Sequence, residues 1–180
     1  MPSFHADLVR GVATAWIEFF EATAQTPPEV VFVPIGLGSG ICACVAARAA
    51  TGARARIIGV VSAHATAYLD SFRAGRPTEA PVTTRLADGL ACRVPDAEAL
   101  AVIRREVDDI VAVTDAEVAA AMRALFADTH NVAEGAGAAA TAAASQQRGR
   151  WSGRRISLPI SGGNVDRDVF ARVLGESVPG

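Results

Sequence analysis

The sequence predicts an α/β fold in which a parallel sheet is covered by helices on both faces. Four short runs rich in β-branched residues are apolar throughout, which is typical of strands that are buried on both sides. Segments with the apolar spacing of helices separate these runs along the chain. The length of 180 residues suits one domain with a sizeable core. We therefore expect a single α/β domain over residues 1–180.

The first half of the chain contains two of the expected strands and two of the expected helices. Apolar residues at helical spacing from Leu8 to Phe20 predict a first helix that ends before Pro27. An alanine-rich helix is expected at residues 41–51, and Gly52 can end it. The four predicted strands lie at residues 30–35, 57–61, 110–113 and 156–160.

The clearest helix signal in the second half is at Thr114, because Thr114 and Glu117 form the pattern of a capping box. A short helix is expected at residues 100–107, and an alanine-rich helix at residues 134–145. Residues 64–93 mix alanine, glycine, proline and charged residues, which predicts a short helix followed by a long loop. Loops of this length in compact domains are commonly functional or mobile.

The composition excludes several classes of chemistry. All 17 basic residues are arginine, so the chain contains no lysine. This excludes P-loop nucleotide hydrolysis, protein-kinase chemistry and any Schiff base formed by a side chain of this polypeptide. A net charge of −2 provides no electrostatic attraction to nucleic acid.

Neither a membrane segment nor a secretion signal is expected. No apolar run approaches the roughly 20 residues that span a bilayer. The start, MPSFHADLVR, lacks the basic end and apolar stretch of a signal peptide. Cys42, Cys44 and Cys92 do not form a disulfide pattern, and no spacing of cysteines and histidines completes a metal site. We expect a cytoplasmic protein with buried thiols and no metal.

A glycine-rich turn follows the first predicted strand, with the sequence Gly36-Leu37-Gly38-Ser39-Gly40. Between a strand and a helix, such a turn lets backbone N–H groups approach a phosphate, and the start of the helix favours negative charge. A tight turn without any ligand explains the same glycines equally well. The spacing departs from the dinucleotide fingerprint, and no carboxylate follows the second strand, so NAD is disfavoured.

A second polar turn, Ser161-Gly162-Gly163-Asn164, follows the last predicted strand. Turns after parallel strands lie along one edge of the sheet, so the two glycine-rich turns can face a single ligand. Glu134 lies at the start of a predicted helix, where the helix dipole favours a carboxylate whether or not a ligand binds.

Four segments, taken in order and spacing, resemble the C-terminal half of the pyridoxal-phosphate-dependent threonine/serine dehydratases. These enzymes have the tryptophan-synthase β-like fold, also called fold type II. The four matching segments are Gly36 to Gly40, Leu86 to Ala91, Asp128 to Ala138, and Ser161 to Asn164. The resemblance implies that the chain is part of the large domain of that fold and that the half carrying the catalytic lysine is absent.

The resemblance also implies roles for individual residues. The loop of Gly36, Leu37, Gly38, Ser39 and Gly40 is similar to the tetraglycine loop whose backbone amides bind the cofactor phosphate. Leu37 and Ser39 replace family glycines, so either their side chains point away from the phosphate or the phosphate-binding turn is altered.

Three further positions are similar to residues that surround the cofactor ring in the family. Ser161 matches a hydroxyl that faces the pyridine nitrogen, Glu134 matches a carboxylate near the ring, and Gly89 lies in a segment that lines the cofactor. The metal site of serine racemase-like members does not carry over, because Ser62 and Tyr68 stand at the positions of its carboxylates.

The implied activity is that of an ammonia-lyase that converts a β-hydroxy amino acid into a 2-oxo acid and ammonia. The family's Schiff-base lysine lies in the N-terminal half, so no catalytic residue is assigned within this chain, and the chain alone is expected to be inactive. The missing half contributes strands to the family's sheet, so we expect exposed strand edges that a second copy or a complementing N-terminal half covers. The alternative is a non-catalytic domain that binds a phosphorylated ligand or a partner.

Overall fold

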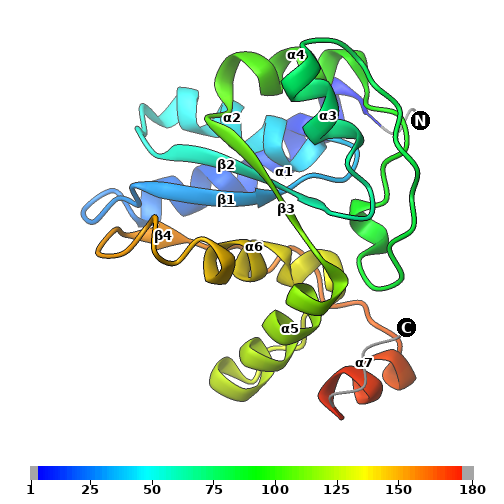
Figure 1. Ribbon diagram of the computed structural model, residues 1–180. Coiled ribbons are helices and arrows are strands. Elements are labelled where there is room, and N and C mark those ends of the chain that lie inside the picture. Colours follow the sequence, from blue (N-terminus) through cyan, green and yellow to red (C-terminus); the bar gives the residue numbers. More distant parts are fainter. Residues whose placement is uncertain (1–3, 176–180) are drawn as a thin grey trace.

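The computed structural model describes residues 4–175 and contains one parallel four-stranded sheet. The strand order is β3-β2-β1-β4, and all three pairings are parallel. The strands are β1 (Val30–Pro34), β2 (Arg56–Ser62), β3 (Asp109–Val113) and β4 (Ile156–Ser157). The predicted α/β class with a parallel sheet is confirmed (Figure 1).

Helices precede, separate and follow these strands. In the described part of the chain they are α1 (Ala6–Ala22), α2 (Ser39–Thr51), α3 (Ala67–Ala74), α4 (Ala97–Glu106), α5 (Asp115–Thr129), α6 (Gly135–Gln146) and α7 (Arg167–Leu174), with a single 3-10 turn, η1 (Asp88–Leu90). None of the helices within residues 4–175 has both the length and the apolar character needed to cross a bilayer.

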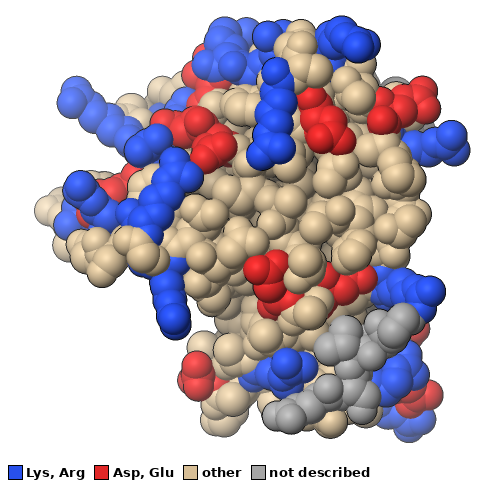
Figure 2. All heavy atoms as spheres, viewed as in Figure 1, with Lys and Arg blue, Asp and Glu red and all other residues tan. Residues whose placement is uncertain are grey.

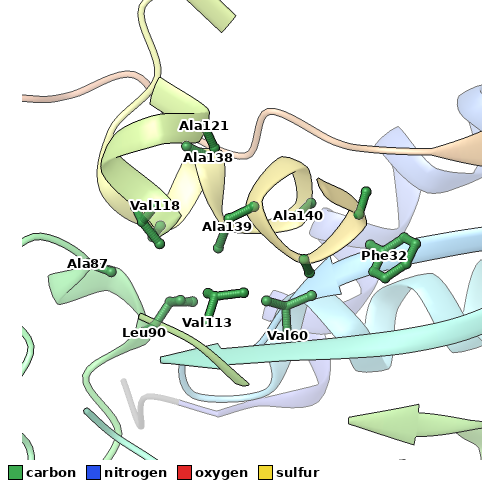
Figure 3. Packing of buried hydrophobic residues seen from close by; sticks show 14 of the residues in the cluster. Phe32, Val60, Ala87, Leu90, Val113, Val118, Ala121, Ala138, Ala139 and Ala140 are labelled. Atoms are coloured by element: carbon green, nitrogen blue, oxygen red, sulfur yellow. The ribbon is translucent and has the colours of Figure 1, made fainter. Parts of the chain in front are cut away.

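The sheet separates two apolar layers, as the continuous apolar strands predict. Phe32 on β1 and Val60 on β2 belong to the layer shared with α5 and α6, whereas Val31 and Val33 belong to the layer shared with α1, α2 and α4. Adjacent strand residues point to opposite faces, so a strand buried on both sides is apolar at every position. Most of α6 is buried alanine, and these small side chains let the helix lie close to the sheet (Figure 3).

The predicted helix ends are confirmed at α2 and α5. The Thr114 N–H donates to Glu117 Oε2 at 2.7 Å, and the Glu117 N–H donates to Thr114 Oγ1 at 3.2 Å, which completes the capping box. Gly52 ends α2 with a φ of 70°, in the left-handed region that glycine adopts without steric cost.

Two features differ from the sequence-based expectation. Only Ile156 and Ser157 of the predicted strand at residues 156–160 pair with β1, and Ile160 is exposed because the chain has left the sheet by then. Helix α7 was not predicted. Its Val173 is fully buried in the layer that contains α5, and Val169 and Phe170 pack against the same layer. These three apolar residues lie at helical spacing, so the sequence did carry a signal for this helix.

The outer edges of the sheet belong to β3 and β4. On β3, the Ala112 carbonyl accepts a hydrogen bond from Gln146 Nε2 at 3.0 Å, so a side chain covers part of this edge. Figure 2 shows a broad uncharged area in the middle of this face, where β3 runs in Figure 1, with a group of acidic side chains directly below it. That a partner covers these edges stays a prediction.

Candidate functional site

The glycine-rich turn joins the carboxyl end of β1 to the start of α2. The Ile35 N–H still donates to the Val60 carbonyl at 2.8 Å, and the first hydrogen bond of α2 runs from the Cys42 N–H to the Gly38 carbonyl at 3.1 Å. Between them, the backbone N–H groups of residues 36–41 have no acceptor among the described residues. These free donors and the positive end of the helix dipole make this turn suited to an anion.

Close approaches of the backbone link this turn to the other segments that carry the resemblance. A Cβ on Gly36 would overlap the Gly89 carbonyl oxygen, and a Cβ on Gly89 would lie 2.7 Å from the Ala136 Cβ. A Cβ on Gly162 would overlap the Glu134 carboxylate. The structure therefore brings together the turn after β1, the loop at Gly89, the start of α6 and the turn after β4.

Asp115 fixes the loop that carries Gly89. The Thr84 hydroxyl donates to Asp115 Oδ1 at 2.7 Å, and the Arg85 N–H donates to Asp115 Oδ2 at 2.8 Å. The Ala87 N–H in turn donates to Thr84 Oγ1 at 3.1 Å. Asp115 is the first residue of α5, so one carboxylate ties the long loop to a helix start. The sequence gives no signal for this role, because an acidic residue in the first turn of a helix is already explained by the helix dipole.

Glu134 lies at the N-terminus of α6, as predicted. Its N–H donates to the Gly162 carbonyl at 3.0 Å, while its side chain makes no capping bond to the helix. The carboxylate is half-buried and lines a hollow of about 350 Å³ together with Arg85, Asp88 and Asn164. The carboxylate is therefore available to a ligand at this edge.

The remaining predicted site residues lie around the same edge with different exposures. Ser161 is exposed, immediately before Gly162, and its side chain has no hydrogen-bond partner in residues 4–175. Leu37 is 46% exposed, so its side chain points to solvent, whereas Ser39 is half-buried in the first turn of α2.

Ser62 and Tyr68, which stand where some family members have metal-binding carboxylates, have neutral side chains. Ser62 Oγ accepts the His64 N–H at 3.1 Å at the end of β2, and Tyr68 is buried beneath the glycine turn. Residues 4–175 contain no cluster of three or more histidine, cysteine, aspartate or glutamate side chains that suits a metal ion.

All three cysteines are free and buried, as predicted. Burial raises the pKa of the Cys42 thiol and of the Cys44 thiol to about 12, from an ordinary value of 9.0. Near neutral pH these thiols are protonated and unreactive, so they act as core residues rather than nucleophiles.

The raised pKa of Cys44 makes stability fall with pH under alkaline conditions. Above about pH 9 the thiol ionises in the unfolded chain but keeps its proton in the folded chain, so the folded state binds more protons. The free energy of unfolding then falls by at most about 1.4 kcal/mol per pH unit for this thiol until about pH 12. Cys44→Ala should make this decline less steep in urea melts from about pH 8.5 to about pH 10.5. Val45→Ala, which removes neighbouring packing but no thiol, should leave the slope unchanged, and equal slopes for Cys44→Ala and the wild type would contradict the expectation.

A comparison with protein-family models decides the family. The model described as "Pyridoxal-phosphate dependent enzyme" matches residues 1–162. The chain belongs to this family. Among curated members, it is 30% identical over 171 residues to an L-threonine ammonia-lyase of Thermotoga maritima, covering 95% of this chain and 42% of that protein. It is 39% identical over 153 residues to an L-threonine ammonia-lyase of Geobacter sulfurreducens, covering 83% of this chain and 38% of that protein.

Solved structures of family members have the same fold. A threonine deaminase from T.th. superposes with a TM-score of 0.81 at 30% identity, covering 88% of this chain and 58% of that one. Maize serine racemase superposes with a TM-score of 0.85 at 27% identity, covering 98% of this chain and 55% of that one. The chain thus spans about half the length of the family members that it matches.

The residues at the carboxyl edge fit the phosphate of the family's cofactor. The unpaired N–H groups of residues 36–41 are the donors that a phosphate requires. The same residues cannot attach the cofactor covalently, because the chain has no lysine.

Proposed function

We propose that this chain is the C-terminal half of a pyridoxal-phosphate-dependent ammonia-lyase of the threonine/serine dehydratase type. The reaction would convert a β-hydroxy amino acid into a 2-oxo acid and ammonia. Family membership and the L-threonine ammonia-lyases among the relatives support the reaction class. The observation that carries the proposal is the direct contact of Gly36 with Gly89, and of Glu134 with Gly162, at one edge of the sheet.

In this proposal the turn after β1 binds the cofactor phosphate. The backbone N–H groups of Gly36, Leu37, Gly38, Ser39 and Gly40 would donate to the phosphate oxygens, and the positive end of the α2 dipole would add to the attraction.

Three residues would surround the ring of the cofactor. The exposed Ser161 hydroxyl would hydrogen-bond to the pyridine nitrogen, Glu134 would lie beside the ring, and Gly89 would line it. Pyridoxal phosphate, when bound, supplies an electron sink for negative charge at the substrate α-carbon. A neutral serine hydroxyl leaves the ring nitrogen largely without a proton, which suits loss of a β-hydroxyl group as water.

The covalent attachment of the cofactor would come from another polypeptide segment. A complementing N-terminal half could supply the lysine and cover the edges at β3 and β4, where the sheet has no further strand within residues 4–175. A second copy of the chain could cover these edges but could not supply the lysine. We infer a cytoplasmic location for the protein, because free thiols suit a reducing compartment. The single α/β domain over residues 1–180 is part of the same proposal.

The absence of lysine favours a second candidate, a non-catalytic domain that binds a phosphorylated ligand or a partner through the same edge. Both candidates predict phosphate binding. They differ in whether the chain takes part in amino-acid deamination once a lysine-bearing half is present.

A calorimetric titration of the full chain with pyridoxal phosphate tests the proposed site. We expect saturable binding, with pyridoxal, which lacks the phosphate, binding at least about tenfold more weakly because it loses the charge-assisted hydrogen bonds. The chain alone should release no 2-oxo acid from L-threonine or L-serine. Equal affinity for the two ligands would contradict the phosphate site, and 2-oxo acid formed by the chain alone would contradict the need for an external lysine.

A further inference from the structure

We propose that the Tyr68 hydroxyl is the positioning group that holds the glycine turn in its phosphate-binding conformation. The inference rests on the proposed function of that turn. It assigns to a residue of α3, outside the turn, the control of how the turn presents its backbone N–H groups.

Tyr68 connects three separate elements through one oxygen atom. Its side chain is 1% exposed, and its hydroxyl donates to the Leu37 carbonyl at 2.9 Å. The same oxygen accepts the Asp96 N–H at 3.2 Å. Asp96 is the N-cap of α4, and its carboxylate accepts the N–H groups of Glu98 and Ala99, both at 2.9 Å. The hydroxyl therefore ties the turn to a well-capped helix start.

The geometry of the peptide bond explains how this contact acts on the turn. In a planar trans peptide the C=O and the following N–H point in opposite directions. The bond from Tyr68 holds the Leu37 carbonyl towards the protein interior, so the Gly38 N–H points outward. There it lies among the other free donors of the turn.

Contacts at Gly38 strengthen this coupling. Gly38 has a φ of 99°, and a Cβ there would lie 2.9 Å from the Tyr68 oxygen and 2.6 Å from the Ala99 Cβ. Tyr68 thus packs directly on Gly38, the N-cap of α2. Burial raises the pKa of Tyr68, so the hydroxyl keeps the proton that it donates to Leu37.

The test is Tyr68→Phe, which keeps the ring and removes the hydroxyl. We expect the affinity for pyridoxal phosphate to fall about tenfold, because the turn loses the bond that orders it. The affinity for pyridoxal should change little, because that ligand does not use the phosphate donors.

Ser71→Ala is the matched control. Ser71 is on the same helix, is fully buried, and its hydroxyl also bridges two backbone groups, donating to the Thr78 carbonyl at 3.2 Å and accepting the Thr78 N–H at 2.8 Å. It does not touch the glycine turn, so Ser71→Ala should destabilise the fold to a similar extent and leave the affinity for pyridoxal phosphate unchanged.

A measurement on the wild type keeps the inference testable if Tyr68→Phe fails to fold. In two-dimensional amide spectra, adding pyridoxal phosphate should shift the Gly38 N–H resonance strongly. Equal affinities of Tyr68→Phe and the wild type for pyridoxal phosphate would overturn the inference and leave the proposed function intact. An unshifted Gly38 resonance with bound ligand would overturn the inference and also the proposed set of phosphate donors. A wild-type chain that binds no pyridoxal phosphate would overturn both.

Discussion

Replacing Gly36 by alanine is expected to lower the free energy of unfolding by about 2–3 kcal/mol and to abolish binding of pyridoxal phosphate. The added Cβ would overlap the Gly89 carbonyl oxygen, which is backbone and cannot swing aside. Relief requires the turn after β1 and the loop at Gly89 to separate. That movement would also displace the N–H groups proposed to bind the phosphate. Urea unfolding and calorimetric titration measure the two effects.

Two glycines provide matched controls for Gly36→Ala. A Cβ on Gly40, in the same turn, would find its nearest neighbour at 4.0 Å, so Gly40→Ala should fold with near wild-type stability. A Cβ on Gly11, inside α1, would meet nothing within 4 Å, so Gly11→Ala should stabilise the chain by about 0.5–1 kcal/mol. Wild-type stability of Gly36→Ala would show that the two loops are not in contact.

Gly135→Ala is expected to destabilise the chain by a similar amount, about 2–3 kcal/mol. Gly135 is the first residue of α6, where helix propensity alone would favour alanine by up to about 1 kcal/mol. The added Cβ would overlap the Leu86 carbonyl oxygen and lie 2.6 Å from its carbon and 3.0 Å from the Ala87 Cα. Since all three atoms are backbone, the loop that carries Gly89 would have to move away from α6.

Whether Gly135→Ala raises or lowers the free energy of unfolding shows which contribution dominates. Helix propensity alone predicts a rise, and the contact with Leu86 predicts a fall. A stabilised Gly135→Ala, measured by urea unfolding, would contradict the packing of Leu86 on α6. Gly149→Ala is the control for a glycine without neighbours, because a Cβ there meets nothing within 4 Å, and its stability should stay within about 0.5 kcal/mol of the wild type.

The fold class and most elements were predictable because their signals are local. Continuous apolar runs indicated strands buried on both sides, which is confirmed for β1, β2 and β3. It is wrong for the fourth run, because only Ile156 and Ser157 pair with β1 and Ile156 is exposed at the edge. The Thr114 and Glu117 pair indicated a capping box that the structure contains. Helix α7 was not predicted although Val169, Phe170 and Val173 lie at helical spacing. The early end of β4 was not predictable, because it depends on where the chain stops pairing with β1.

The candidate site was predictable in part. The turn at Gly36 to Gly40 was a candidate phosphate site from its place between a strand and a helix, with a tight turn without ligand as the alternative. Glu134 became a candidate only through the family resemblance, because its place at the start of α6 is explained without a ligand. The roles of Asp115 and Tyr68 could not be predicted, because each side chain acts on a segment far from it in sequence.

The sequence by itself showed which covalent chemistry the chain cannot perform, and it predicted most of the helices and strands. Without lysine no side chain can attach the cofactor, whatever the fold. Only the tertiary structure decided which elements meet. Strand order and helix packing place the Gly36 turn against the Gly89 loop and Glu134 against Gly162, and they seat a buried tyrosine under the turn. The physical reason is that propensity and capping act over a few residues, whereas these contacts depend on how the two layers pack against one sheet.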